Sequence, residues 1–131
     1  MTEINSNKQR ILITGVSGLI GRILFNYFTK AYPDKYEIFG LDQHLNISLR
    51  YQADNEKNDE IERNYPIPLD KFFQCDIIDR NKLFQIIEQQ QIQIIIHLAA
   101  VLENHPNLET ISRVNIEGTK NVFEARESFY Q

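Results

Sequence analysis

The sequence predicts an α/β fold, a doubly wound parallel sheet of about four strands, on three observations. Short apolar runs alternate with segments of helical periodicity in the order strand, helix, strand, strand, helix, strand, helix. A glycine-rich turn joins the first apolar run to the first helical segment. The apolar run over residues 92–98 is nearly continuous, which is typical of a parallel strand that is buried on both faces. With 131 residues, the chain has the length of one domain.

The first half of the chain predicts a strand, a helix and a second strand. Residues 10–14 (RILIT) form a short, branched apolar run, which favours a buried strand. The helix that follows should end before Pro33, because the residue before a proline avoids the helical region. Residues 36–41 (YEIFGL) predict the second strand. Apolar residues recur at helical spacing between the two strands and predict one buried helix face, formed by Leu19, Ile20, Ile23, Leu24, Tyr27 and Phe28.

Residues 43–70 form a long polar and charged segment that contains Pro66 and Pro68. A structureless loop of this length is uncommon in a compact domain. We therefore expect a flexible insertion, with one helical turn near residues 58–63.

The second half of the chain continues the alternation. Residues 71–75 (KFFQC) predict the third strand, and Asp79 can cap a helix over residues 80–91. Residues 92–98 (IQIIIHL) are almost entirely apolar and predict a central fourth strand. Residues 108–130 have mostly helical spacing, interrupted by Gly118, which requires a packing reason.

Composition excludes several classes of protein. The 14 Lys and Arg residues are outnumbered by 18 Asp and Glu residues, a balance that disfavours sequence-independent binding to nucleic acid. No apolar stretch is long enough for a membrane span, and the polar N-terminus predicts no secretory signal. The single cysteine, Cys75, excludes an internal disulfide and fits a reducing cytoplasm, where we expect the protein. One Cys and three scattered His residues predict no metal site.

The turn over residues 14–21 (TGVSGLIG) is the strongest functional motif, because a predicted strand leads into it and a predicted helix leads out. Gly15 would make the tight turn, Gly18 would let the backbone approach a pyrophosphate, and Gly21 would let the helix pack closely. The free N–H groups of the helix start then face the phosphates. The alternative is an ordinary turn that uses glycine for its backbone. The residues assigned to a dinucleotide are Gly15, Ser17, Gly18, Leu19, Ile20 and Gly21.

Asp42 ends the second predicted strand, about 20 residues beyond the glycine turn, where a carboxylate can accept both hydroxyls of an adenosine ribose. The same charge would repel a 2′-phosphate, so we expect NAD rather than NADP as the cofactor. The next basic residue, Arg50, is too distant in sequence to compensate. The alternative interpretation is a solvated turn residue.

These residues and three further segments resemble a known family. The chain is similar to the N-terminal half of an extended short-chain dehydrogenase/reductase, of the NAD-dependent epimerase/dehydratase group. Besides the TGxxGxxG turn and Asp42, the resemblance rests on Asp76-Ile77 and on residues 97–100 (HLAA). Residues 114–122 are similar to the family's NVxGTxNV helix. The resemblance implies a Rossmann-like sheet of strand order 3-2-1-4 that is incomplete, with the whole chain forming the N-terminal part of the NAD(P)-binding domain.

The resemblance also implies further contacts with the cofactor. Asp76 would meet the adenine amine, small residues after the fourth strand would let the cofactor pass close by, and Asn115 would shape the helix beside the active site. Each of these assignments has an alternative. Asp76 could serve only as a turn residue, and the alanines and Asn115 could have only structural roles. His97 could be a packed residue at the end of the strand. The residues added to the cofactor-binding set are Asp76, Ile77, Leu98, Ala99, Ala100 and Asn115.

Catalysis in the family uses a Tyr-x-x-x-Lys pair, and the sequence contains none. The nearest approaches are Tyr27 with Lys30 and Tyr32 with Lys35, each three residues apart. The family places the pair after a fifth strand, so no catalytic residue is assigned and we expect the chain to be inactive alone. A fourth strand without a neighbour would also leave an apolar edge open, which predicts marginal stability, self-association or a complementing chain.

Three functional hypotheses follow. The chain is the NAD-binding half of a truncated enzyme; or a second chain supplies the fifth strand, the Tyr/Lys pair and the substrate lobe of a split enzyme; or the chain is a stand-alone NAD-binding or scaffold module. A completed enzyme would epimerise or dehydrate a nucleotide sugar, or oxidise another secondary alcohol. The sequence does not specify the substrate or the oligomeric state.

Overall fold

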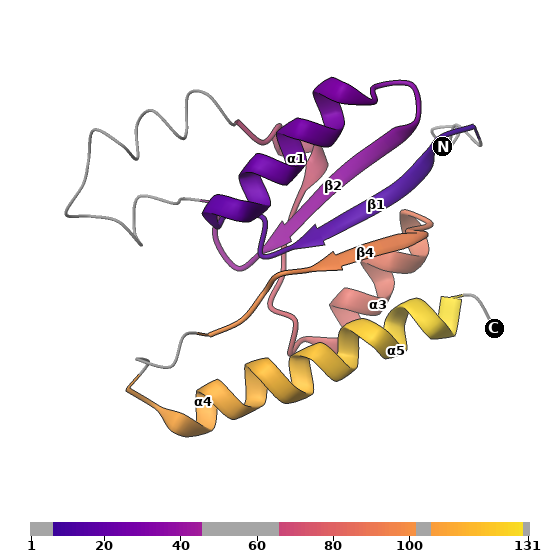
Figure 1. The fold of residues 1–131 in the computed structure, drawn as a ribbon. Coiled ribbons are helices and arrows are strands. Elements are labelled where there is room, and N and C mark those ends of the chain that lie inside the picture. Colours follow the sequence, from indigo (N-terminus) through magenta and orange to yellow (C-terminus); the bar gives the residue numbers. More distant parts are fainter. Residues whose placement is uncertain (1–6, 46–65, 102–105, 130–131) are drawn as a thin grey trace, which may run out of the picture.

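A computed structural model describes residues 7–45, 66–101 and 106–129 of the chain. Within these residues, four parallel strands form one sheet of order β3-β2-β1-β4, which confirms the predicted fold and strand order (Figure 1). The strands are β1 (Gln9–Thr14), β2 (Tyr36–Asp42), β3 (Phe72–Gln74) and β4 (Ile94–His97). Most of the predicted insertion, including the helical turn expected at residues 58–63, lies outside the described residues.

Strand β1 lies in the interior of the sheet, between β2 and β4. The prediction that the fourth strand is central is wrong for the described residues, because β4 is an edge strand there and its side chains are only partly buried. Ile11 pairs with Ile38 of β2 on one side and with Ile94 of β4 on the other. Successive β1 side chains point to opposite faces, so Leu12 and Ile13 enter different hydrophobic clusters, and both are completely buried. This burial on both faces is the reason for the continuous apolar run in the sequence.

Helices cover the two faces of the sheet (Figure 1). Helix α1 (Leu19–Ala31) packs on one face, and helices α3 (Arg80–Gln89) and α5 (Thr119–Phe129) pack on the other. The short helix η2 (Leu69–Lys71) leads into β3. The fold is therefore wound in both directions from β1, and the carboxyl ends of all four strands lie at one edge of the sheet.

The predicted start of α3 and the predicted end of α1 agree with the structure, because a capping residue and a proline determine them locally. The Asp79 side chain accepts a hydrogen bond from the Lys82 N–H at 3.3 Å, which confirms the predicted cap of α3. Helix α1 ends at Ala31, before Pro33, as predicted. Helix α3 ends two residues earlier than predicted, because Gln91 adopts a left-handed backbone with a φ of 50°.

The predicted apolar face of α1 is wrong. Ile20 and Tyr27, two of its members, are 64% and 55% exposed, and Leu19 and Ile23 are exposed as well. Only Leu24 and Phe28 of the predicted set pack against the core. The helix instead buries Gly21, Arg22, Phe25 and Asn26. The glycine turn holds this side of the helix against the protein, and the buried polar side chains bond to backbone carbonyls.

The single helix predicted over residues 108–130 consists of three parts. These are α4 (Leu108–Ser112), a π-helical segment, η3 (Arg113–Gly118), and α5. Gly118 has the packing reason that its position requires, because a Cβ there would lie 2.5 Å from Cδ1 of the buried Ile77. None of the helices in the described residues is both long and apolar enough to cross a bilayer.

Candidate functional site

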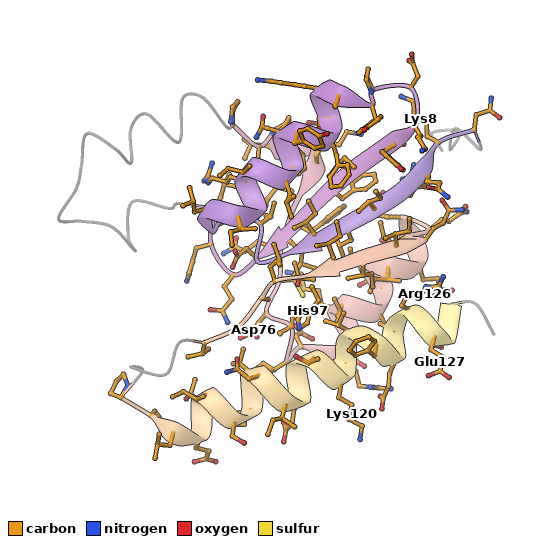
Figure 2. All side chains as sticks on the ribbon, in the orientation of Figure 1. Lys8, Asp76, His97, Lys120, Arg126 and Glu127 are labelled. Atoms are coloured by element: carbon orange, nitrogen blue, oxygen red, sulfur yellow. The ribbon has the colours of Figure 1, made fainter. Side chains whose placement is uncertain are left out.

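The carboxyl ends of β1, β2 and β4 surround a cavity of about 110 Å³. In parallel α/β sheets, ligands bind at this edge, where the connections diverge to opposite faces. The loop after β3 contributes Asp76, which lies close to the carboxyl end of β4 in Figure 2. The cavity brings together six of the residues predicted from sequence, namely Gly15, Asp42, Asp76, Ile77, Ala99 and Ala100.

The glycine turn leaves β1 and begins α1 in the geometry that its glycines require. Gly15 has a φ of 72°, and a Cβ on it would lie 2.7 Å from the Ala99 backbone nitrogen. A Cβ on Gly21 would lie 2.6 Å from the Gly15 carbonyl oxygen. Gly18 has extended backbone angles, so its conformation does not itself require glycine. Glycine at positions 15 and 21 thus brings β1, α1 and the chain after β4 into close contact.

The N-terminus of α1 is open to an anion. Helix geometry leaves the N–H groups of Leu19, Ile20 and Gly21 without carbonyl partners inside the helix. Gly18 provides no side-chain cap, and the first turn contains no acidic residue. These donors, together with the positive end of the helix dipole, form the arrangement that binds phosphate groups in dinucleotide-binding turns.

Asp42 connects the end of β2 to the glycine turn. Its Oδ2 atom accepts a hydrogen bond from the Ser17 N–H at 3.0 Å, and its Oδ1 atom accepts one from the Gln43 N–H at 2.8 Å. Asp42 is only partly buried and lines the cavity beside Gly15. The carboxylate therefore lies beside the glycine turn, the arrangement expected for an acceptor of ribose hydroxyls.

The loop after β3 forms the opposite wall of the cavity. The Oδ1 atom of Asp76 accepts a hydrogen bond from the Ile78 N–H at 3.0 Å, so this side chain also fulfils the alternative role of a turn residue. Ile77 is 3% exposed and packs beneath Gly118. Cys75 is buried, and burial raises the pKa of its thiol to about 11, which keeps the thiol protonated and unreactive.

A hydroxyl–imidazole network supports the end of β4. The Oγ1 atom of Thr14 accepts hydrogen bonds from the Leu98 and Ala99 N–H groups at 3.0 and 3.2 Å. With both lone pairs used, the Thr14 hydroxyl must donate to His97 Nδ1, 2.7 Å away. His97 Nε2 then carries the proton and donates to Thr119 Oγ1 at 2.8 Å. His97 is thus a packed strand-end residue, and burial lowers the pKa of its imidazole.

Asn115 acts on the site through the chain after β4. Its Oδ1 atom accepts from the Val101 N–H at 2.8 Å, and its Nδ2 atom donates to the Val101 carbonyl at 3.0 Å. Asn115 does not line the cavity. The side chain lies in η3, and this irregular helix places its amide opposite Val101. Asn115 therefore has a structural role in the described residues, which is the alternative stated above.

Several predicted residues lie beside the cavity rather than in its lining, namely Ser17, Gly18, Leu19, Ile20, Gly21, Leu98 and Asn115. The roles of Thr14 and Arg22 were not predicted from the sequence. A polar residue at the end of a buried strand was a usable signal for Thr14. Arg22 gave no signal, because an arginine among apolar helix residues is usually exposed. Among the described residues, no group of three or more His, Cys, Asp or Glu side chains could hold a metal ion.

The residues present fit a dinucleotide. The turn has the positive φ at Gly15, the first turn of α1 has neither a side-chain cap nor an acidic residue of its own, and an acid ends β2. Ala99 lies so close to Gly15 that the two backbones pack directly together. These features leave the edge of the sheet accessible to a ligand that brings a pyrophosphate and a ribose diol.

Comparison with protein families and curated proteins gives a consistent result. The model of the NAD dependent epimerase/dehydratase family matches residues 11–129. Methionine adenosyltransferase 2 subunit beta of Bos taurus is 28% identical over 125 residues, which are 92% of this chain and 29% of that protein. The dTDP-glucose 4,6-dehydratase of Haemophilus influenzae is 32% identical over 126 residues, 92% of this chain and 33% of the enzyme. The chain spans about a third of the length of the curated relatives it matches.

Solved structures share the fold. The enzyme WbmG of Bordetella bronchiseptica, solved in complex with NAD and UDP, matches with a TM-score of 0.71 and 20% identity. The match covers 95% of this chain and 36% of that protein. At this identity, the likeness establishes the fold alone.

Proposed function

We propose, since this chain belongs to the NAD-dependent epimerase/dehydratase family, that it binds NAD at the carboxyl edge of its sheet. The first turn of α1 would hold the pyrophosphate, Asp42 would hold the adenosine ribose, and Asp76 with Ile77 would lie beside the adenine. Ala99 and Ala100 would leave room for the cofactor past β4. NAD, when bound, supplies a hydride acceptor for the oxidation of a secondary alcohol.

One observation carries this proposal. The Asp42 carboxylate bonds to the Ser17 N–H inside the glycine turn, so an acid and the phosphate-binding helix start belong to one rigid corner. A negative charge at this corner favours a free ribose diol over a 2′-phosphate. NAD is therefore the expected form and NADP the disfavoured one.

Isothermal titration calorimetry with NAD tests the proposal. Removing a charged acceptor from two ribose hydroxyls should cost on the order of 1.5–3 kcal/mol of binding free energy, so Asp42→Ala should weaken NAD binding accordingly. Gly18→Val should abolish binding by placing a side chain where the pyrophosphate approaches. Asp34→Ala, which removes an exposed acid between α1 and β2, is the matched control. Equal NAD affinity in the Asp42→Ala and Asp34→Ala proteins would refute the site.

Substrate chemistry depends on residues that this sequence lacks. We propose that this chain corresponds to the cofactor half of an enzyme that is completed by a Tyr-x-x-x-Lys pair and a substrate lobe, and that the completed enzyme acts on a nucleotide sugar or another secondary alcohol. Two curated relatives, a UDP-glucuronate 4-epimerase and a dTDP-glucose 4,6-dehydratase, support the nucleotide-sugar class. Turnover of a nucleotide sugar by the chain completed with this pair and lobe, but not by the chain alone, would support the proposal. A completed protein that turns over no nucleotide sugar and no other secondary alcohol would refute it.

A second candidate function is binding without chemistry. The sequence has no Tyr-x-x-x-Lys pair, and one curated relative is named as a subunit of methionine adenosyltransferase. In this function the chain would be an NAD-binding or scaffold module of a larger assembly in a reducing cytoplasm. A difference between its NAD and NADH affinities would support a sensing role, and equal affinities would remove it.

A further inference from the structure

The buried face of α1 contains two polar side chains, Arg22 and Asn26, which are 4% and 7% exposed. Arg22 donates from Nε to the Ser17 carbonyl at 3.4 Å and from Nη2 to the Leu45 carbonyl at 2.5 Å. Asn26 donates from Nδ2 to the Pro66 carbonyl at 3.3 Å. Arg22 therefore joins the glycine turn to the chain that follows Asp42, although the guanidinium does not line the cavity.

A second side chain makes the same connection from the turn itself. Ser17 is 6% exposed, and its hydroxyl donates to the His44 carbonyl. Three consecutive residues after β2 are thus held in place. The Gln43 N–H bonds to the Asp42 carboxylate, the His44 carbonyl bonds to Ser17, and the Leu45 carbonyl bonds to Arg22. Such burial of a guanidinium and a hydroxyl is favourable only when carbonyl partners satisfy their donors.

The hydrogen bonds at Asp42 explain what this connection achieves. A carboxylate offers about four lone-pair sites, and the Ser17 and Gln43 N–H groups use one on each oxygen. One site per oxygen is left, which matches the two donors of a ribose diol. A 2′-phosphate removes one of these donors and places negative charge against the carboxylate. This discrimination requires that the carboxylate stay in place.

We propose that Arg22 and Ser17 are positioning residues for cofactor selectivity. By tying the chain after β2 to the glycine turn, they keep the Asp42 carboxylate aimed at the adenosine ribose. This inference rests on the proposed NAD site and adds the residues that set its preference. Without the connection, Asp42 can turn toward solvent, and NAD loses an acceptor while a 2′-phosphate loses a repelling charge.

The test is the ratio of NAD to NADP affinity, measured by calorimetry on the full chain. Arg22→Met should weaken NAD binding by about tenfold without weakening NADP binding, so the ratio should fall by about tenfold. Arg22→Lys keeps a donor and should recover part of the ratio. Arg113→Met, an exposed arginine on η3, is the matched control. A general loosening of the fold would weaken both cofactors equally and leave the ratio unchanged.

Ser17→Ala keeps the backbone N–H that binds Asp42 and removes only the hydroxyl, so it tests the proposal even if Arg22→Met does not fold. We expect a smaller fall of the ratio, of about threefold. If Ser17 acts through Asp42, Ser17→Ala should have no further effect on NAD affinity in an Asp42→Ala background.

The outcomes separate the two proposals. A parent chain that binds NAD with no dependence on Asp42 refutes the proposed site. A parent chain that prefers NAD through Asp42, but whose ratio is unchanged by Arg22→Met and Ser17→Ala, refutes the positioning role and leaves the site intact. An additive effect of Ser17→Ala in the Asp42→Ala background likewise refutes it.

Discussion

His97 shows how one side chain supports the end of β4 through hydrogen bonds to its neighbours. Its ring bonds Thr14 on one side and Thr119 on the other, and Thr14 in turn holds the N–H groups that follow β4. This arrangement requires Nδ1 to be an acceptor, so it fits only the neutral imidazole. Protonation would place a donor against the Thr14 hydroxyl, whose lone pairs are already in use.

The protein should therefore lose stability in mild acid. Burial lowers the pKa of His97 in the folded state below its ordinary value of 6.5, so the unfolded chain takes up the proton first. This contribution to the free energy of unfolding is fully present above pH 6.5 and decreases as the pH falls below it. Urea unfolding at several values between about pH 5 and about pH 8 measures the slope. In His97→Gln, which has no titrating group at this position, the slope should be smaller; an identical slope would contradict the assignment.

Among the elements, the helical region from α4 to α5 best illustrates what can and cannot be predicted from the sequence. Its periodicity predicted a helix, and Gly118 predicted a close contact without naming the partner. The partner is Ile77, which approaches from the loop after β3, a distant part of the chain. Contacts of this kind depend on how the elements pack, so local patterns indicate that they exist but do not identify them.

Gly118→Ala should destabilise the fold. The added methyl would meet Ile77 Cδ1 at 2.5 Å and Cγ1 at 2.6 Å in a buried site, which should cost about 1–3 kcal/mol of unfolding free energy. Ile77→Val removes Cδ1, so the cost of Gly118→Ala should be smaller in that background. Denaturant unfolding of the four proteins gives the coupling energy. If the two substitutions are additive, the predicted contact is not the cause.

Helix α1 shows where prediction from periodicity fails. Its apolar residues were assigned to the core because of their spacing, yet Ile20 is 64% exposed and Arg22 is 4% exposed. The glycine turn determines which side of the helix faces the protein, and that side bonds to carbonyls of the chain after β2. The strands, the sheet order and the acidic end of β2 were predictable, because each depends on local sequence or on the family resemblance. The hydrogen bonds of Arg22, Thr14 and Asn115 were not, because they join distant segments.

At the scale of the whole molecule, the notable feature is the second edge of β4. None of the described residues pairs with this edge, although β4 is an apolar strand of a parallel sheet. A groove of about 710 Å³ lies between β4 and α5, and it includes Ile94 and Phe123, which are 38% and 68% exposed. Figure 2 shows Arg126 and Glu127 near the C-terminal end of the same helix. Such a surface is typical of an interface.

We expect the chain to associate through this groove at high concentration. Phe123→Ser should shift sedimentation toward the monomer while leaving the free energy of unfolding nearly unchanged, because the side chain is already exposed. Leu108→Ser, which alters a 78% exposed residue on α4 outside the groove, is the matched control. Sedimentation velocity over a range of concentrations measures both variants. Equal association in the two would place the contact elsewhere.

The hydrogen bonds from α1 to the Leu45 and Pro66 carbonyls have a consequence for how the chain can be lengthened. Arg22 and Asn26 are one helical turn apart, and they bind Leu45 and Pro66, the residues on either side of the segment 46–65. The described residues on the two sides of this segment, Leu45 and Pro66, are therefore both fastened to one helix. Lengthening a loop between fixed ends costs little, since the entropic penalty grows only with the logarithm of its length. We therefore expect residues added between Leu45 and Pro66, even a grafted reporter domain, to leave the register of the strands unchanged.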